Sequence, residues 1–172
     1  STLSLSNFEI SNNIAGGPSA IYLRGTLLSF NNCIIKDNIS LSDTQAITTS
    51  SASATINMKG KIVLNGNYYL KGTEKLARSV YLASGQVIPI TGRIDPTSQI
   101  YLQMAAAGVF TDGFQAKSSG TPASVFLSNL TQYAVRLNSA GECELGVAGV
   151  ADAWEAAVSE SLKNGGNKYT FS

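Results

Sequence analysis

A loose internal repeat in the first hundred residues restricts the fold of this chain more than any other feature. The segments "NFEISNN" (7–13), "NCIIKDN" (32–38) and "KIVLNGN" (61–67) align with steps of 25 and 29 residues. A period of this length is typical of solenoids, because one short repeat cannot bury its apolar side alone and needs stacked neighbours. The sequence therefore predicts a stack of similar coils.

The aligned positions keep their chemistry from one repeat to the next. The apolar columns are Phe8–Cys33–Ile62 and Ile10–Ile35–Leu64, and the polar column is Asn13–Asn38–Asn67. Two further series of short alternating strands recur around these segments, "TLSL", "LLSF" and "TINM" before them and "SAIYL", "QAITT" and "RSVYL" after them. We expect the asparagines to stack as a ladder at one corner, since Asn tolerates unusual backbone angles and its amide can bond its neighbours.

These patterns predict an all-β fold, a parallel β-helix or solenoid, with the coils in residues 1–105. A β-sandwich stays open as an alternative, because short alternating strands between turn residues suit it too. Residues 106–148 are expected to close the unit, with strands at 123–128 and a hairpin at 133–147. The Gly-, Ser- and Thr-rich segment 108–122 is predicted to be a loop, and the insert at 71–77 to be a loop leaving one face.

The last segment, 151–172, predicts a short amphipathic helix followed by the start of a strand. Asp152 and Glu155 form a capping-box pattern, and Gly165 ends the helix. Such a helix can cover the open end of a solenoid, either of this unit or of a following one. We therefore expect the chain to be a unit of a longer tandem protein, with neighbouring repeat units of the same chain as partners.

The repeats resemble right-handed parallel β-helices of the pectin-lyase-like type. The stretch "SNNIAGGPSAIYL" (11–23) is similar to the repeats of chlamydial polymorphic outer-membrane proteins, although Pro18 and Ser19 interrupt their Gly-Gly-Ala-Ile motif. The stretch "SVYLASGQVIPITGRIDPTSQIYLQ" (79–103) is similar to repetitive surface proteins of spirochaetes such as treponemes. This resemblance implies a location outside the cell or at the bacterial cell surface, at the outer membrane, and an adhesive role.

The composition argues against several kinds of chemistry and partner. The chain contains no His, which excludes Ser-His, Cys-His and zinc-His sites. The net charge is +1 and the sequence has no basic run, so we expect no binding to nucleic acid. It also has no apolar stretch long enough to span a bilayer, so we expect no insertion of this segment into a membrane. The sequence leaves open whether Cys33 and Cys143 are paired.

The acidic residues are too sparse to predict catalysis. A polysaccharide-cleaving site needs clustered carboxylates, and the nearest candidates, Glu9, Asp37 and Asp43 with Arg24, show no such spacing. We therefore predict no enzyme and no catalytic, cofactor or metal site. The weak candidates for partner contact are Tyr68, Tyr69 and Lys71 in "GNYYLKG" (66–72), where one Tyr of the strand points inward and one outward.

The expected function is a non-catalytic structural or adhesive unit of a larger bacterial cell-surface or secreted repeat protein. Its coils would present a stiff polar face to a host or matrix protein or to a glycan. The alternative is a β-helix protein that binds or cleaves polysaccharide. The position of the acidic and aromatic side chains in the folded chain distinguishes the two.

Overall fold

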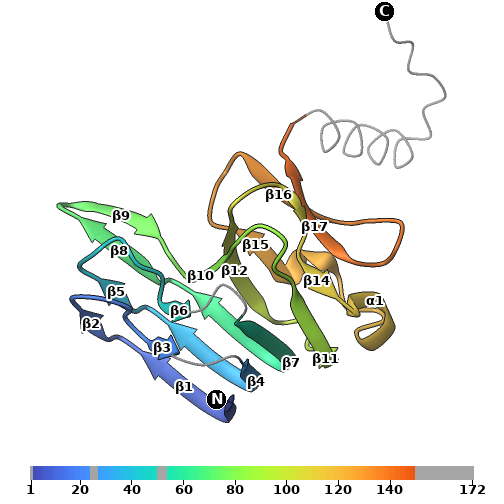
Figure 1. Ribbon diagram of the computed structural model, residues 1–172, viewed down its shortest axis with the longest axis horizontal. Helices are drawn as coiled ribbons and strands as arrows, with labels where there is room; N and C mark the ends of the chain where they lie inside the picture. The colour runs from blue at the N-terminus through green and yellow to red at the C-terminus, as the bar shows by residue number, and fades with distance from the viewer. Residues whose placement is uncertain (1, 24–26, 50–53, 150–172) are drawn as a thin grey trace, which may run out of the picture.

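The computed structural model describes residues 2–23, 27–49 and 54–149. These residues form a parallel β-solenoid of about 5 turns, which we call coils (Figure 1). The predicted fold class is therefore confirmed over this part of the chain. The helix predicted within 151–172 lies outside the described residues.

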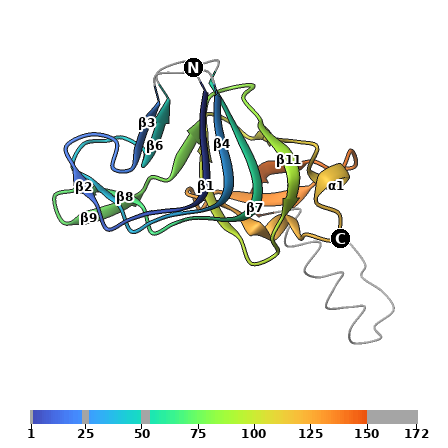
Figure 2. The ribbon, with the colours of Figure 1, turned by 90° about the horizontal axis from the view of Figure 1, so that it is seen from below.

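Each of the first three coils contributes one strand to each of three faces, and equivalent strands stack in parallel. The long face contains β1 (Thr2–Ser11), β4 (Leu27–Lys36) and β7 (Thr55–Asn65); the short face contains β2 (Ile14–Ala15), β5 (Ile39–Ser40) and β8 (Tyr68–Lys71); and the third face contains β3 (Ile21–Leu23), β6 (Ile47–Thr49) and β10 (Val80–Leu82). Figure 2 shows the long-face strands side by side, with the short face extending to one side.

The register follows the columns that the repeat predicts. Phe8 pairs with Cys33, which pairs with Ile62, and Ile10 pairs with Ile35, which pairs with Leu64. The side chains alternate between the inside and outside of the coil, so β4 has the buried positions Leu28, Phe30, Cys33 and Ile35. Parallel pairing places equivalent residues of successive coils next to one another. Each coil therefore covers the apolar side chains of the next.

The long face differs from the prediction in one respect. The sequence suggested two short strands separated by a turn, whereas β1, β4 and β7 are continuous strands that bend in the middle. The bend falls at Asn7 (φ 53°), Asn32 (φ 55°) and Gly60 (φ 75°). One residue in the left-handed region redirects the chain and lets strand pairing resume beyond it, so no separate turn is needed.

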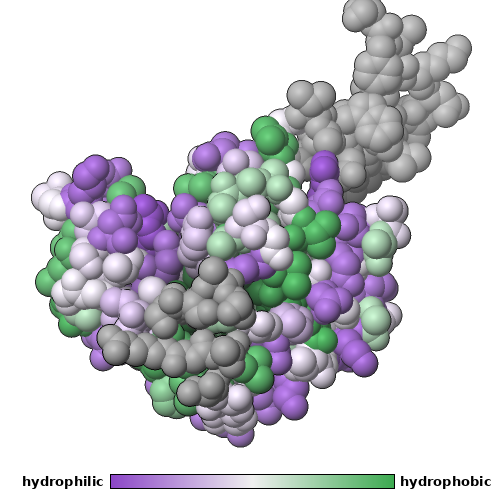
Figure 3. Space-filling model, in the orientation of Figure 1, coloured by the Kyte–Doolittle hydropathy of each residue, from purple (hydrophilic) through white to green (hydrophobic). Residues whose placement is uncertain are grey.

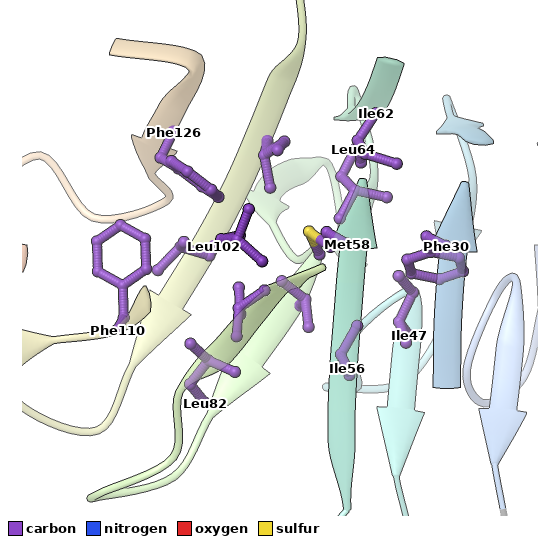
Figure 4. Packing of buried hydrophobic residues seen from close by; sticks show 14 of the residues in the cluster. Phe30, Ile47, Ile56, Met58, Ile62, Leu64, Leu82, Leu102, Phe110 and Phe126 are labelled. Carbon is purple, nitrogen blue, oxygen red and sulfur yellow. The ribbon is translucent and has the colours of Figure 1, made fainter. Parts of the chain in front are cut away.

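Buried apolar side chains fill the space between the faces. Phe30, Met58 and Leu64 lie in this cluster, and Phe110 and Phe126 extend it toward the last coil (Figure 4). Cys33 and Cys143 are both buried members of the core, and both are free thiols. The pairing that the sequence left open is therefore not formed.

The fourth coil omits the short face. Its strand β11 (Ile88–Ile94) pairs with the first half of β7, while β12 (Gln99–Met104) pairs with the end of β7 and also with β10. Above the short face, β8 instead pairs antiparallel with β9 (Glu74–Ala77). The insert at 71–77, predicted to be a loop, thus forms the tip and second strand of a hairpin.

The last described part of the chain consists of five short strands and two short helices. It contains β13 (Gly108–Val109), β14 (Thr111–Asp112), α1 (Phe114–Lys117), a 3-10 helix at Ala123–Val125, β15 (Phe126–Ser128), β16 (Tyr133–Leu137) and β17 (Cys143–Val147). The β16–β17 hairpin confirms the prediction for 133–147. The β15 strand stacks on β12 in parallel and thereby begins a further coil.

The prediction of a loop at 108–122 is wrong in part, because two short strands and α1 lie within it. Phe110 and Phe114 are fully buried, and each meets Phe126 edge-to-face, with ring centroids 5.2 and 5.8 Å apart. The Glu142 carboxylate accepts hydrogen bonds from the backbone N–H groups of Gly113 and Phe114, which begin the helix. Long-range contacts therefore stabilise a helix that the local composition does not favour.

Candidate functional site

A pocket of about 240 Å³ lies where the short face ends. It separates the β8–β9 hairpin from the part of the chain that includes β12 and the residues after β15. Figure 3 shows a notch between the surface over β8 and β9 and the surface over β16. The described lining residues are Asn65, Gly66, Asn67, Tyr68, Lys75, Ala77, Ser79, Tyr101 and Asn129.

The pocket exists because the fourth coil omits the short face. Ile100 pairs with Leu64, so the next residue, Tyr101, follows β7 directly and lies above Asn65. Tyr68 remains on the hairpin, which projects away from the continuing coils. Tyr68 and Tyr101 are 33 residues apart in the sequence and belong to different coils. The pocket therefore forms between two coils and not within one repeat.

The floor of the pocket is the end of the predicted asparagine ladder. Asn13 Nδ2 donates to Asn38 Oδ1, and Asn38 Nδ2 donates to Asn67 Oδ1, both at 2.9 Å. Asn67 Nδ2 in turn donates to the Ile35 carbonyl oxygen at 2.8 Å and to the Ser79 hydroxyl at 3.4 Å. Both the oxygen and the nitrogen of the Asn67 amide are therefore already hydrogen-bonded. Asn67 fixes the floor of the pocket, and contact with a ligand would fall to other side chains.

Asn129 is the lining residue with unused hydrogen-bonding capacity. Its Nδ2 and Oδ1 atoms are both buried and have no hydrogen-bond partner among the described residues. An unsatisfied buried polar group costs about 1–3 kcal/mol. Both atoms are covered as the side chain lies, so the amide would have to turn toward the pocket to donate to one polar atom of a ligand and accept from another.

One side of the pocket carries an aromatic ring and a positive charge. Lys75 Nζ lies 4.7 Å from the centroid of the Tyr68 ring, within the range of a cation–π interaction. Tyr68 faces Ala77 across the hairpin, and Lys75 lies two residues along the same strand as Ala77, so the contact is diagonal on one face of the hairpin. Lys75 is the charged residue of the described lining.

The structure separates the three residues that the sequence proposed for partner contact. Tyr68 lines the pocket, whereas Tyr69 and Lys71 alternate to the opposite face of the hairpin and lie outside the lining. Sequence reasoning missed Lys75, Tyr101 and Asn129. The spacing of residues around Gly72 is typical of a hairpin and could have indicated Lys75. Tyr101 and Asn129 reach the pocket only because the fourth coil omits the short face.

The acidic residues considered for catalysis are not part of the described lining, although the Asp37 carboxylate lies against Gly66 at the edge of the pocket. Glu9 pairs with Lys36 at 3.4 Å, and Asp43 pairs with Arg78 at 2.9 Å. Asp37 occupies a left-handed bend with φ 56°, and Arg24 lies outside the described residues. Within residues 2–23, 27–49 and 54–149, no three His, Cys, Asp or Glu side chains gather as metal ligands do.

Comparison with known proteins assigns the chain to no family. No protein-family model, no curated protein and no solved structure matches it. In the part of the chain that the structure describes, no helix has both the length and the apolar character needed to cross a membrane.

Proposed function

We propose that the chain is a non-catalytic adhesive unit of a larger bacterial cell-surface or secreted repeat protein, with a solenoid of the pectin-lyase-like kind. The stacked coils are a stiff support, because each strand pairs with equivalent strands and shares one continuous core. The partner is a host or matrix protein or a glycan, and it is held at the pocket between β8–β9 and Asn129.

The observation that carries this proposal is the chemistry of the pocket. Its described lining combines two tyrosine rings, an ammonium group and an unpartnered amide. Such groups hold a ligand by stacking and hydrogen bonding. Cleavage of a glycosidic bond usually needs two carboxylates on either side of the bond, and the described lining contains none.

The test is retention of the chain on surfaces coated with matrix proteins and with glycans. We expect the wild-type chain to be retained on at least one surface, and Tyr68→Ala and Lys75→Ala to reduce retention. Tyr69→Ala is the matched control, because Tyr69 is a neighbouring residue of the same type on the opposite face of the hairpin. Failure to bind any surface would contradict the adhesive role.

A second measurement separates the adhesive role from the enzymatic alternative. The chain is incubated with acidic and neutral polysaccharides, with and without calcium, and new chain ends are counted. We expect no release. Release that Asp37→Ala abolishes would show that the protein cleaves polysaccharide, with a catalytic carboxylate that is not among the described lining residues.

A further inference from the structure

The outward side chains of the third face form a row that crosses the strands. Tyr22 pairs with Thr48, and Tyr81 pairs with Gln103. The pairing of Val80 with Ile47 places Tyr81 beside Thr48, and the pairing of Leu102 with Ser128 places Asn129 beside Gln103. The tyrosine row, as we call it, is therefore Tyr22–Thr48–Tyr81–Gln103–Asn129.

The two tyrosines of the row face away from the core. Tyr22 and Tyr81 are 53% and 44% exposed, whereas the residues on either side of them in β3 and β10 are buried. Neighbouring strands are about 4.8 Å apart, which puts the two tyrosines about 9.6 Å apart and the ends of the row about 19 Å apart. Two exposed rings thus repeat along the axis of the solenoid at twice the strand spacing.

The second half of the row contains polar groups without partners. Gln103 Oε1 is buried and makes no hydrogen bond among the described residues, and the same is true of both polar atoms of the Asn129 amide. Asn129 also lines the pocket, so the row and the pocket meet at this residue. Two independent features, the exposed rings and the unsatisfied amides, therefore lie on one continuous line.

We propose that the tyrosine row binds an extended, neutral, β-linked glycan that runs along the solenoid axis, with one sugar in the pocket beside Asn129. This inference rests on the proposed adhesive function and names its ligand class. The flat faces of sugar rings pack on exposed aromatic rings, and the Asn129 amide, once turned toward the pocket, would both donate to and accept from sugar hydroxyls. None of the five positions of the row is charged, and the one charged group of the described pocket lining, Lys75, lies over the Tyr68 ring, so the row itself favours a neutral chain over an acidic one.

The spacing adds a length requirement. In an extended β-linked chain every second sugar presents the same face, and this repeat of two sugars is close to the distance of about 9.6 Å between Tyr22 and Tyr81. The whole row accommodates about four sugars on the same scale. A ligand of this class should thus bind more tightly as it lengthens, until it covers the row.

The test is calorimetric titration of the 172-residue chain with β-1,4-linked oligomers of glucose, N-acetylglucosamine and mannose, one to six sugars long. A uronate oligomer is the acidic comparator. We expect at least one neutral series to bind, with affinity rising from two to four sugars and then levelling. Tyr81→Ala should weaken binding of the longer oligomers about tenfold, and Tyr69→Ala should leave it unchanged.

A second variant separates recognition from folding. Asn129→Leu keeps the size of the side chain and removes two unsatisfied polar atoms, so we expect the thermal midpoint to stay the same or rise while oligomer binding is lost. A drop in the thermal midpoint with unchanged binding would overturn the role of Asn129.

The outcomes also distinguish this inference from the proposed function. Retention on a matrix-protein surface, with no neutral oligomer bound, would overturn the glycan inference and leave the adhesive function standing. Tighter binding of the uronate oligomer, or equal binding of one sugar and four, would likewise overturn it. If the chain is retained on no surface, both the adhesive function and the glycan inference are wrong.

Discussion

At the scale of single residues, Asn38 shows how a side chain can connect three coils. Its side chain is fully buried, and its Oδ1 accepts from both the backbone N–H and the Nδ2 of Asn13. Its Nδ2 is within hydrogen-bonding distance of Asn67 Oδ1 and of the Lys36 carbonyl oxygen, each at 2.9 Å. Every polar atom of this side chain is therefore matched by a group from its own coil or from the one below or above.

Asn38→Ala should lower the free energy of unfolding by about 3 kcal/mol, because it leaves several buried polar groups without partners. The comparison is Asn13→Ala, at the exposed end of the same ladder, which should cost about 1 kcal/mol or less. Urea unfolding followed by circular dichroism measures both. Equal losses from the two variants would show that the ladder does not act as a connected series.

The two cysteines give a test of burial. Burial raises the pKa of the Cys33 thiol, and burial raises the pKa of Cys143 to about 12, against an opposing hydrogen bond with Thr111. A raised pKa in the folded state favours the neutral thiol, so this contribution to stability is complete below pH 9 and is lost as the pH rises from 9 toward 12.

At pH 8 we expect neither thiol of the native chain to react with a thiol reagent, because both are buried and neutral. In guanidinium without a reductant both should react. The measurement is the number of thiols per chain that react after unfolding, and we expect two. If no thiol reacts, Cys33 and Cys143 are joined in a disulfide.

At the scale of elements, the bends in β1, β4 and β7 decide the cross-section of the solenoid. Each bend uses a residue with positive φ, two of them Asn and the third Gly60. At Gly60 an added Cβ would collide with Asn32 Oδ1, which accepts a hydrogen bond from the Lys61 backbone N–H at 2.9 Å. The bend of one strand therefore depends on the side chain of the strand beneath it.

Gly60→Ala should destabilise the protein by about 2 kcal/mol, from the left-handed backbone alone, with the collision against Asn32 adding to it. Gly16→Ala is the matched control, because an added Cβ there meets nothing within 4 Å and no positive φ is involved. Thermal unfolding of the two variants measures the difference. A control that loses as much as Gly60→Ala would contradict the role of the bend.

At the scale of the whole molecule, stability should depend on where a coil lies in the stack. Leu5, Phe30 and Met58 form one inward column, in which Phe30 and Met58 are almost completely buried and Leu5 is only partly buried. A residue between two coils is covered on both sides, whereas β1 is covered by β4 on one side among the described strands.

Phe30→Ala should therefore cost about 4 kcal/mol, and Leu5→Ala less than about 2 kcal/mol. Amide hydrogen exchange provides a second measurement, in which β1 should exchange faster than β4 and β7 because it lies at the edge. Uniform protection across the three strands would instead indicate that the stack opens as a single cooperative unit.

The stacking of the first three coils was predictable from the sequence. Columns such as Ile10–Ile35–Leu64 and Asn13–Asn38–Asn67 repeat the same chemistry, and parallel in-register pairing is the arrangement that brings like residues together. The hairpin at 133–147 was predictable for a similar reason, since two alternating segments flank a turn sequence. In both cases the determining pattern lies within a short stretch or repeats at a regular step.

The pocket and α1 were decided by tertiary structure alone. Tyr101 and Asn129 reach Tyr68 only because the fourth coil omits the short face, and no local pattern shows where a coil will be shortened. Phe114 enters a helix because its ring packs against Phe126, although the surrounding Gly and Ser favour a loop. The repeat determines how coils stack, whereas contacts between residues that do not repeat determine where the stack changes, and the candidate binding site lies at that change.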